Sequence, residues 1–138
     1  MTKKLELYKC NVCGNLVQVL VEGEGELVCC GETMKKLTPQ NDTADENLRE
    51  KHTPLIKAND VSTKVYVDEH PMVNKHYIMF LQTVSNDNDE VLTKFLYPGS
   101  EAVMKVDAAN KNITAYSYCN IHGLYKSNHN CGCGTCQI

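Results

Sequence analysis

The sequence lacks several features that mark whole classes of protein. It has no run of basic residues, and 14 lysines and arginines against 17 aspartates and glutamates give a formal net charge of −3. Duplex-binding proteins carry a basic footprint, so we expect no nucleic-acid partner. No segment approaches the roughly 18 apolar residues of a membrane span, and the first nine residues lack the apolar stretch of a secretory signal. We therefore expect a cytoplasmic protein that does not enter a membrane.

Cysteine is absent from the long middle of the chain and abundant outside it. The eight cysteines form an early group, a single thiol and a tail group: Cys10, Cys13, Cys29 and Cys30; Cys119; Cys131, Cys133 and Cys136. In a reducing cytosol such cysteines indicate metal or redox chemistry rather than disulfides. The apolar fraction of 42% and the charged fraction of 22% suit a folded chain with a core.

The first 37 residues and the rest of the chain differ in character. Residues 1–37 hold only short apolar runs broken by glycines, which bury too little surface to fold without a metal or another staple. Residues 38–49 are polar and we interpret them as a linker. Within it, Thr43 followed three residues later by Glu46 is a capping-box pattern for one short helical turn.

Beyond the linker, β-type runs recur at intervals of 10 to 14 residues with turn-forming residues between them. The expected strands are Thr53–Lys57, Thr63–Val67, Tyr77–Val84, Val91–Leu96, Ala102–Val106 and Ile113–Tyr118. Short strands at this regular spacing favour an antiparallel sandwich or barrel. The sequence thus predicts an all-β protein with little helix.

The early cysteines are candidates for a tetrathiolate metal site. Cys10 and Cys13 form a C-x-x-C pair, and Gly14 behind them lets the backbone turn. Cys29 and Cys30 are adjacent, with Cα atoms about 3.8 Å apart, so they cannot form a second pair of that kind and we expect distorted metal geometry. Four thiolates select zinc or iron, which composition does not separate. A structural zinc site and, less favoured, disulfide pairs are the alternatives.

Histidines supply a second candidate site. His52, His70, His76 and His122 all fall in the β region, and His122 follows Cys119 by three residues. Each histidine taken alone fits an ordinary loop or core position. Together with the single thiol they make a nitrogen-and-sulfur site for iron, zinc or copper, because neutral imidazole and thiolate are good ligands for all three.

Five strings of the sequence occur in the order found in one known family. EKHTP (residues 50–54), HPMVNKHY (70–77) and YCNIHGL (118–124) resemble motifs of the desulfoferrodoxins, which are two-iron superoxide reductases. YKCNVCGN (8–15) and LVCCG (27–31) resemble the desulforedoxin-type domain of the same proteins. The resemblance spans residues 4 to about 126.

This resemblance implies a fold, two cofactors and a reaction. Residues 1–37 would be a desulforedoxin- or rubredoxin-like domain with an iron tetrathiolate, and residues 50–126 a seven-stranded immunoglobulin-like β-sandwich. The sandwich would hold a second iron, with four imidazoles in a plane and the Cys119 thiolate on the axis. The family reduces superoxide to hydrogen peroxide by one electron and two protons, draws electrons from a rubredoxin-type donor and forms homodimers.

Two residues beside His52 are candidates for catalysis. The Lys51 cation would attract superoxide locally against the negative net charge, since distant carboxylates are screened over about 8 Å at physiological salt. By resemblance, the Glu50 carboxylate would occupy the sixth position of the oxidised iron. The alternatives are a solvated lysine and a surface carboxylate.

Residues 127–138, with Cys131, Cys133 and Cys136, extend beyond the resemblance, and we assign this tail no role.

The sequence leaves two other functions open. A non-catalytic iron protein that carries electrons would not need an open coordination position or the Glu50–Lys51 pair. A zinc-stabilised binding module would be colourless.

Overall fold

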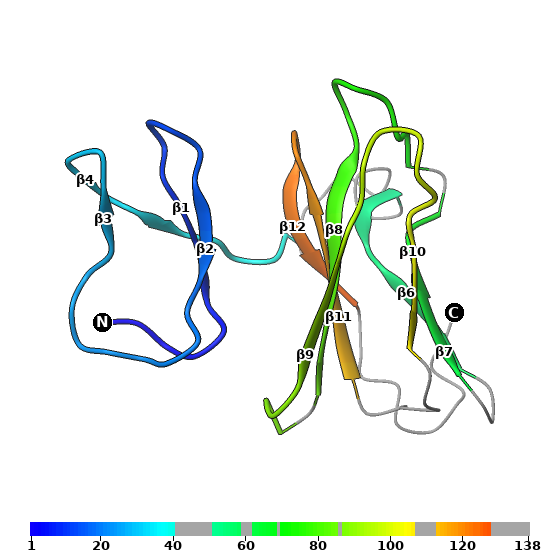
Figure 1. The fold of residues 1–138 in the computed structure, drawn as a ribbon, viewed down its shortest axis with the longest axis horizontal. Helices are drawn as coiled ribbons and strands as arrows, with labels where there is room; N and C mark the ends of the chain where they lie inside the picture. Colours follow the sequence, from blue (N-terminus) through cyan, green and yellow to red (C-terminus); the bar gives the residue numbers. More distant parts are fainter. Residues whose placement is uncertain (41–50, 59–61, 69, 86, 107–112, 128–138) are drawn as a thin grey trace. The chain divides into compact units, whose positions relative to one another are not determined.

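The computed structural model describes residues 1–40, 51–58, 62–68, 70–85, 87–106 and 113–127 (Figure 1). Nearly all regular structure in these ranges is antiparallel β-sheet. The chain divides into two compact units, Met1–Thr38 and Pro39–Ile138. The helical turn expected from Thr43, the residue Glu50 and the tail from residue 128 lie outside the described residues. No helix in the described ranges is long and apolar enough to cross a membrane.

Unit 1 consists of two very small sheets. Strands β1 (Leu7–Lys9), β2 (Leu16–Gln18) and β5 (Lys35–Lys36) form a sheet in the order β2-β1-β5, and β3 (Val28–Cys29) pairs with β4 (Glu32–Thr33). Its buried apolar cluster comprises only four residues, Tyr8, Cys10, Val19 and Met34, with Leu27 and Cys29 packed against them. A core of this size does not offset the entropy of ordering nearly 40 residues, so the unit needs a cross-link.

Unit 2 is a sandwich of two antiparallel sheets. Strands β6 (Leu55–Ala58), β7 (Thr63–Tyr66) and β10 (Val103–Val106) form one sheet in the order β10-β7-β6. Strands β8 (Ile78–Ser85), β9 (Val91–Phe95), β11 (Ile113–Cys119) and β12 (Gly123–Lys126) form the other, in the order β12-β11-β8-β9. The described residues therefore contain the seven strands that the resemblance implies.

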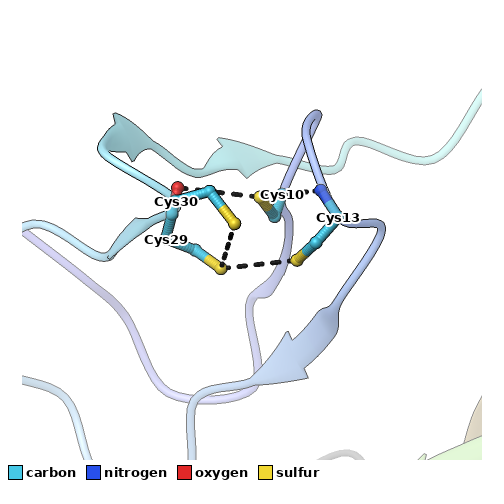
Figure 2. Close-up of side chains that lie close together, drawn as sticks. All are labelled: Cys10, Cys13, Cys29 and Cys30. Carbon is cyan, nitrogen blue, oxygen red and sulfur yellow. Dashed lines mark hydrogen bonds between the residues drawn. The ribbon is translucent and has the colours of Figure 1, made fainter.

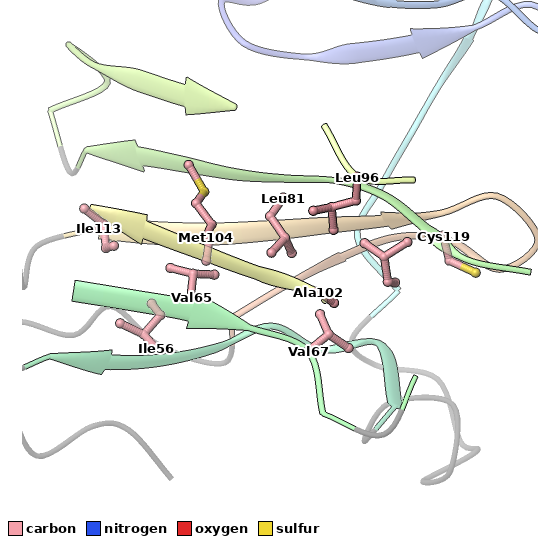
Figure 3. Close-up of a cluster of buried hydrophobic side chains, with 11 residues drawn as sticks. Ile56, Val65, Val67, Leu81, Leu96, Ala102, Met104, Ile113 and Cys119 are labelled. Atoms are coloured by element: carbon pink, nitrogen blue, oxygen red, sulfur yellow. The ribbon is translucent and has the colours of Figure 1, made fainter. Parts of the chain in front are cut away.

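The core of unit 2 lies between these sheets. Figure 3 shows side chains of both sheets pointing into the shared layer, among them Val65 and Met104 from one sheet and Leu81 from the other. Alternation along the strands produces this arrangement, as in β7, where buried Val65 lies between exposed Lys64 and half-buried Tyr66. Eleven buried residues of the described ranges form this cluster, and Cys119 is one of them.

The six expected strand runs all correspond to strands, with ends that differ by at most two residues. Strand β12 was not expected. Both Leu124 and Tyr125 in it are buried, so it lacks the polar–apolar alternation by which a short strand is recognised in a sequence.

Candidate metal centres

The four early cysteines reach one point in unit 1 from two loops (Figure 2). Cys10 follows β1, and Cys13 lies in the turn after it. Gly14 closes this turn with a positive φ of 84°, and its N–H donates a hydrogen bond of 3.0 Å to the Cys10 carbonyl. We call Cys10, Cys13, Cys29 and Cys30 the four-cysteine cluster.

A tight hairpin explains how adjacent cysteines join this cluster. Cys29 is the last residue of β3 and pairs with Glu32, so Cys30 and Gly31 are the two turn residues. Their φ angles of 56° and 77° are those of a type I′ turn, which requires the left-handed region at both positions. Because Cys30 lies in the turn rather than on the strand, its side chain is released from strand alternation and its sulfur lies 3.9 Å from that of Cys29.

The sulfur spacing suits one tetrahedral metal ion. All four Sγ atoms lie within 4.8 Å of one another, and those of Cys13 and Cys29 are 3.5 Å apart. Metal–sulfur bonds of about 2.3 Å in a tetrahedron place the sulfurs about 3.8 Å apart. The cluster therefore has the dimensions of a tetrathiolate site.

Electrostatics show why this cluster requires a cation. The backbone N–H groups of Cys13 and Val12, each 3.4 Å from the Cys10 sulfur, lower the pKa of Cys10 to about 6. Hydrogen bonding with Cys13 and Cys10 raises the pKa of Cys29 to about 12. Without a metal the crowded thiols share protons, and only a cation among them holds all four as thiolates.

The second cluster lies at one end of the sandwich in unit 2. His52 precedes β6, His70 and His76 lie on the loop between β7 and β8, Cys119 ends β11, and His122 lies in the turn before β12. We call these five residues the histidine–cysteine cluster. His52 is 2% exposed and Cys119 is fully buried.

The four imidazoles form a closed ring of neighbours. Their centroids are 4.6 Å apart for His52 and His70, 4.6 Å for His70 and His76, 5.0 Å for His76 and His122, and 4.7 Å for His122 and His52. Neighbouring ring planes cross at 65° to 80°. The distance across, from His52 to His76, is longer at 6.1 Å. The rings thus occupy the corners of a four-sided figure.

The ring nitrogen atoms converge inside this four-sided arrangement. The Nδ1 atom of His70 donates to the Pro71 carbonyl at 2.6 Å, which leaves its Nε2 as an acceptor. The Nε2 atoms of His70 and His76 are buried and have no hydrogen-bond partner among the described residues. Buried unpaired polar atoms are costly, and a metal ion would satisfy both.

The remaining donors complete the cluster. His122 Nδ1 lies 3.0 Å from His52 Nε2 and 3.8 Å from Cys119 Sγ. Ligand atoms of His52, His70, His76 and Cys119 all lie within 4.8 Å of one another. Four nitrogens and one sulfur fit an iron ion, for which imidazole and thiolate are established ligands.

Burial keeps the imidazoles in their metal-binding form. Desolvation lowers the pKa of His70 to about 4 and also lowers that of His76. Desolvation also raises the pKa of Cys119, and the backbone N–H groups of His122 and Ile121 partly offset this rise by hydrogen bonding to the sulfur. Neutral imidazoles bind metals, whereas the buried thiol loses its proton when a cation arrives.

The lowered pKa of His70 makes the metal-free sandwich sensitive to acid. The unfolded chain takes up a proton at His70 near its ordinary value of 6.5, and the folded chain only near 4, so stability should fall as the pH drops through this window and level off below it. Urea unfolding of the metal-free chain, followed by amide signals of unit 2 between pH 7 and 4, measures this. His70→Gln should flatten that part of the profile, and an unchanged profile would contradict the assignment.

Comparisons with known proteins agree with both clusters. Residues 2–37 match the family model of the desulfoferrodoxin N-terminal domain, and residues 44–128 match the model of desulfoferrodoxin itself. Desulfoferrodoxin of Desulfarculus baarsii is 44% identical over 131 residues, which cover 92% of this chain and 98% of the relative. The chain belongs to the desulfoferrodoxin family. The resemblance of the five motifs is thereby confirmed.

Two further likenesses refine this assignment. Desulforedoxin of Megalodesulfovibrio gigas is 56% identical over 36 residues, which cover 26% of this chain and 97% of the relative. The crystal structure of the superoxide reductase from Treponema pallidum has a TM-score of 0.67 at 20% identity, covering 93% of this chain and all of that one. The first likeness concerns the four-cysteine unit and the second the overall fold.

The described residues include most of the predicted site. The structure brings Cys10, Cys13, Cys29 and Cys30 together, and likewise His52, His70, His76, Cys119 and His122. Lys51 is exposed beside His52, and Glu50 lies outside the described residues.

Sequence analysis missed two residues that support His52. Ser117 Oγ donates to the His52 carbonyl, and the buried Tyr125 ring stacks on the His52 ring with centroids 4.8 Å apart. Both come from strands more than 60 residues further along the chain. No spacing in the sequence connects them with a histidine loop.

Proposed function

We propose that this chain is a superoxide reductase that acts at the histidine–cysteine cluster. Superoxide takes up one electron and two protons and leaves as hydrogen peroxide. The observation that carries the proposal is the convergence of four imidazole nitrogens and one thiolate, with two buried Nε2 atoms that have no other partner among the described residues.

His52, His70, His76, His122 and Cys119 would hold an iron ion, which would supply the electron and accept the anion as a further ligand. The neutral imidazoles hold the metal without adding charge, so the site remains electropositive toward an anion. The Cys119 thiolate donates electron density, which favours loss of an electron. The core around Cys119 keeps water from the sulfur.

Lys51 attracts the substrate in this proposal. It is exposed and adjoins buried His52 in the chain, so its cation stays near the cluster while its ammonium group remains in water. A unit charge pair at 4 Å is worth about 1 kcal/mol in water and about 4 kcal/mol at an intermediate dielectric. Glu50 is part of the proposal as a hard oxygen donor to the oxidised iron, on the strength of the motif alone.

Replacement of Lys51 should slow the reaction without removing iron. We expect Lys51→Ala to lower the second-order rate of superoxide reduction by about tenfold and to flatten its dependence on ionic strength. Stopped-flow or pulse-radiolysis measurements at several salt concentrations test this. Lys57→Ala removes the same charge from an exposed position on β6 and should change neither quantity. Equal behaviour of the two variants would exclude a role for Lys51.

The proposal also includes a rubredoxin-type electron donor and a homodimer, which rest on the resemblance. A cytoplasmic location and the division into residues 1–37, 38–49, 50–126 and 127–138 are part of it as well, and they draw on the sequence patterns described above. The four-cysteine cluster holds the other of the two irons, which serves unit 1 as its cross-link.

Metal analysis with a visible spectrum and a superoxide pulse tests the proposed function. A natively grown preparation should contain two irons per chain, and a superoxide pulse should oxidise the ferrous histidine–cysteine centre in a second-order reaction. A colourless zinc protein, or a ferrous centre that superoxide leaves reduced, would refute the proposal.

A further inference from the structure

We propose that Asn120 is a positioning residue that fixes His76 relative to Cys119 and His122. It lies directly after Cys119, in the turn that leads to His122. Such a role has meaning only where the cluster holds a metal, so the proposal rests on the metal centre of the proposed function and not on the reaction with superoxide.

Asn120 makes three hydrogen bonds to the two residues that flank His76. Its side-chain Oδ1 accepts from the Tyr77 N–H at 3.0 Å, and its Nδ2 donates to the Lys75 carbonyl at 3.1 Å. Its own N–H donates to the Tyr77 carbonyl at 3.2 Å. One residue therefore holds the backbone on both sides of His76.

The turn that carries His76 is closed on its other side as well. Val73 and His76 exchange two backbone hydrogen bonds, of 3.1 Å and 3.0 Å, around Asn74 and Lys75. Asn120 attaches this closed turn to the loop of Cys119 and His122. The turn and the loop then behave as one body, and the direction of His76 Nε2 follows from it.

Strand pairing alone does not provide this connection. The register of β11 on β8 runs regularly to Tyr118, which pairs with Phe80, and shifts between Tyr118 and Cys119, which pairs with Ile78. A β-bulge at this point interrupts the ladder just where it reaches the metal ligands. The Asn120 side chain continues the connection beyond the bulge, across 43 to 45 residues of sequence.

Only an amide has the chemistry that both side-chain bonds require. An asparagine presents one acceptor and one donor from the same short side chain, whereas an aspartate presents two acceptors. Asn120→Asp would keep the bond from Tyr77 and direct a carboxylate oxygen at the Lys75 carbonyl. Asn120→Ala would remove both bonds. The two variants therefore weaken the attachment in different ways.

Metal affinity measures the consequence directly. Loss of residues that orient metal ligands generally weakens metal binding by about 10- to 100-fold. We would titrate the metal-free full chain anaerobically with Co²⁺, whose visible spectrum distinguishes a four-sulfur site from a site of four nitrogens and one sulfur. We expect Asn120→Ala and Asn120→Asp to weaken Co²⁺ binding at the histidine–cysteine cluster by this factor and to shift its sulfur-to-cobalt band.

Three controls separate positioning from folding. The four-cysteine cluster of the same molecules should bind Co²⁺ as in the unaltered chain. Asn74→Ala removes an exposed amide from the same turn and should leave both sites unchanged. Urea unfolding of the metal-free variants shows how much of unit 2 is folded during the titration.

Unaltered Co²⁺ affinity and spectrum in both Asn120 variants would overturn the proposal. A loss of affinity that the unfolded fraction of metal-free unit 2 fully accounts for would overturn it too, because Asn120 would then support the fold and not the site. Co²⁺ binding does not involve superoxide. If the unaltered chain binds Co²⁺ at both clusters but its iron form does not react with superoxide, the proposed function fails and the role of Asn120 stands.

Discussion

Cys119→Ser should abolish the sulfur-to-iron absorption band of the histidine–cysteine centre and lower the rate of superoxide reduction by about 100-fold, which corresponds to about 2.7 kcal/mol of activation free energy. Serine nearly matches cysteine in size, so the substitution neither opens a cavity nor overpacks the core at this fully buried position. What changes is the donor atom. A hydroxyl oxygen donates far less electron density than a thiolate, and the iron then gives up its electron less readily.

The rate is measured by pulse radiolysis on fully reduced chains with a known iron content, so that loss of metal is not mistaken for loss of reactivity. Cys133→Ser makes the same chemical change in the tail, to which we assign no role, and serves as the control. A variant that binds iron, lacks the absorption band and still reacts at the parent rate would show that the thiolate does not promote the reaction.

Removal of iron from the four-cysteine cluster should unfold unit 1 and leave unit 2 folded. The buried apolar cluster of unit 1 comprises four residues, against eleven among the described residues of unit 2. Small domains of this kind draw most of their folding free energy from the metal, about 10 to 16 kcal/mol for comparable structural zinc sites. Without the metal, the crowded thiols also share protons instead of cross-linking the loops.

Chelation of the metal and the substitution Cys13→Ser test the unfolding of unit 1 independently. The substitution removes a ligand of the four-cysteine cluster and leaves the histidine–cysteine centre loaded. Amide spectra should lose dispersion for Tyr8, Val19 and Met34, whereas Val65 and Leu81 in the core of unit 2 should keep both dispersion and protection from hydrogen exchange. A well-dispersed spectrum for unit 1 in both preparations would show that its small sheets fold without the metal.

The sequence predicts most of the sandwich because its strands obey local rules. Polar–apolar alternation, as at Lys64, Val65 and Tyr66, and turn-forming residues between the runs predict six of the seven strands that the structure describes in unit 2. Strand β12 cannot be predicted in this way, because Leu124 and Tyr125 are both buried and the strand lacks the polar–apolar alternation.

The candidate ligands can be predicted from the sequence, whereas the residues that support them cannot. Cysteine and histidine carry chemistry that spacing and motif reveal, so all nine ligand candidates were identified from the sequence. Ser117 and Tyr125 contact His52 across more than 60 residues, and such pairs become neighbours only when β11 and β12 are placed beside the histidine loop. The type I′ turn separates the side chains of Cys29 and Cys30, and it explains how two adjacent cysteines can both join one metal site.

The most direct test of the central claim is the product stoichiometry of superoxide consumption. The fully reduced, iron-loaded chain is mixed anaerobically with a substoichiometric pulse of superoxide, and hydrogen peroxide and dioxygen are measured together. A superoxide reductase produces one hydrogen peroxide for each superoxide consumed and no dioxygen. Release of dioxygen in step with peroxide would identify dismutation instead and contradict the account.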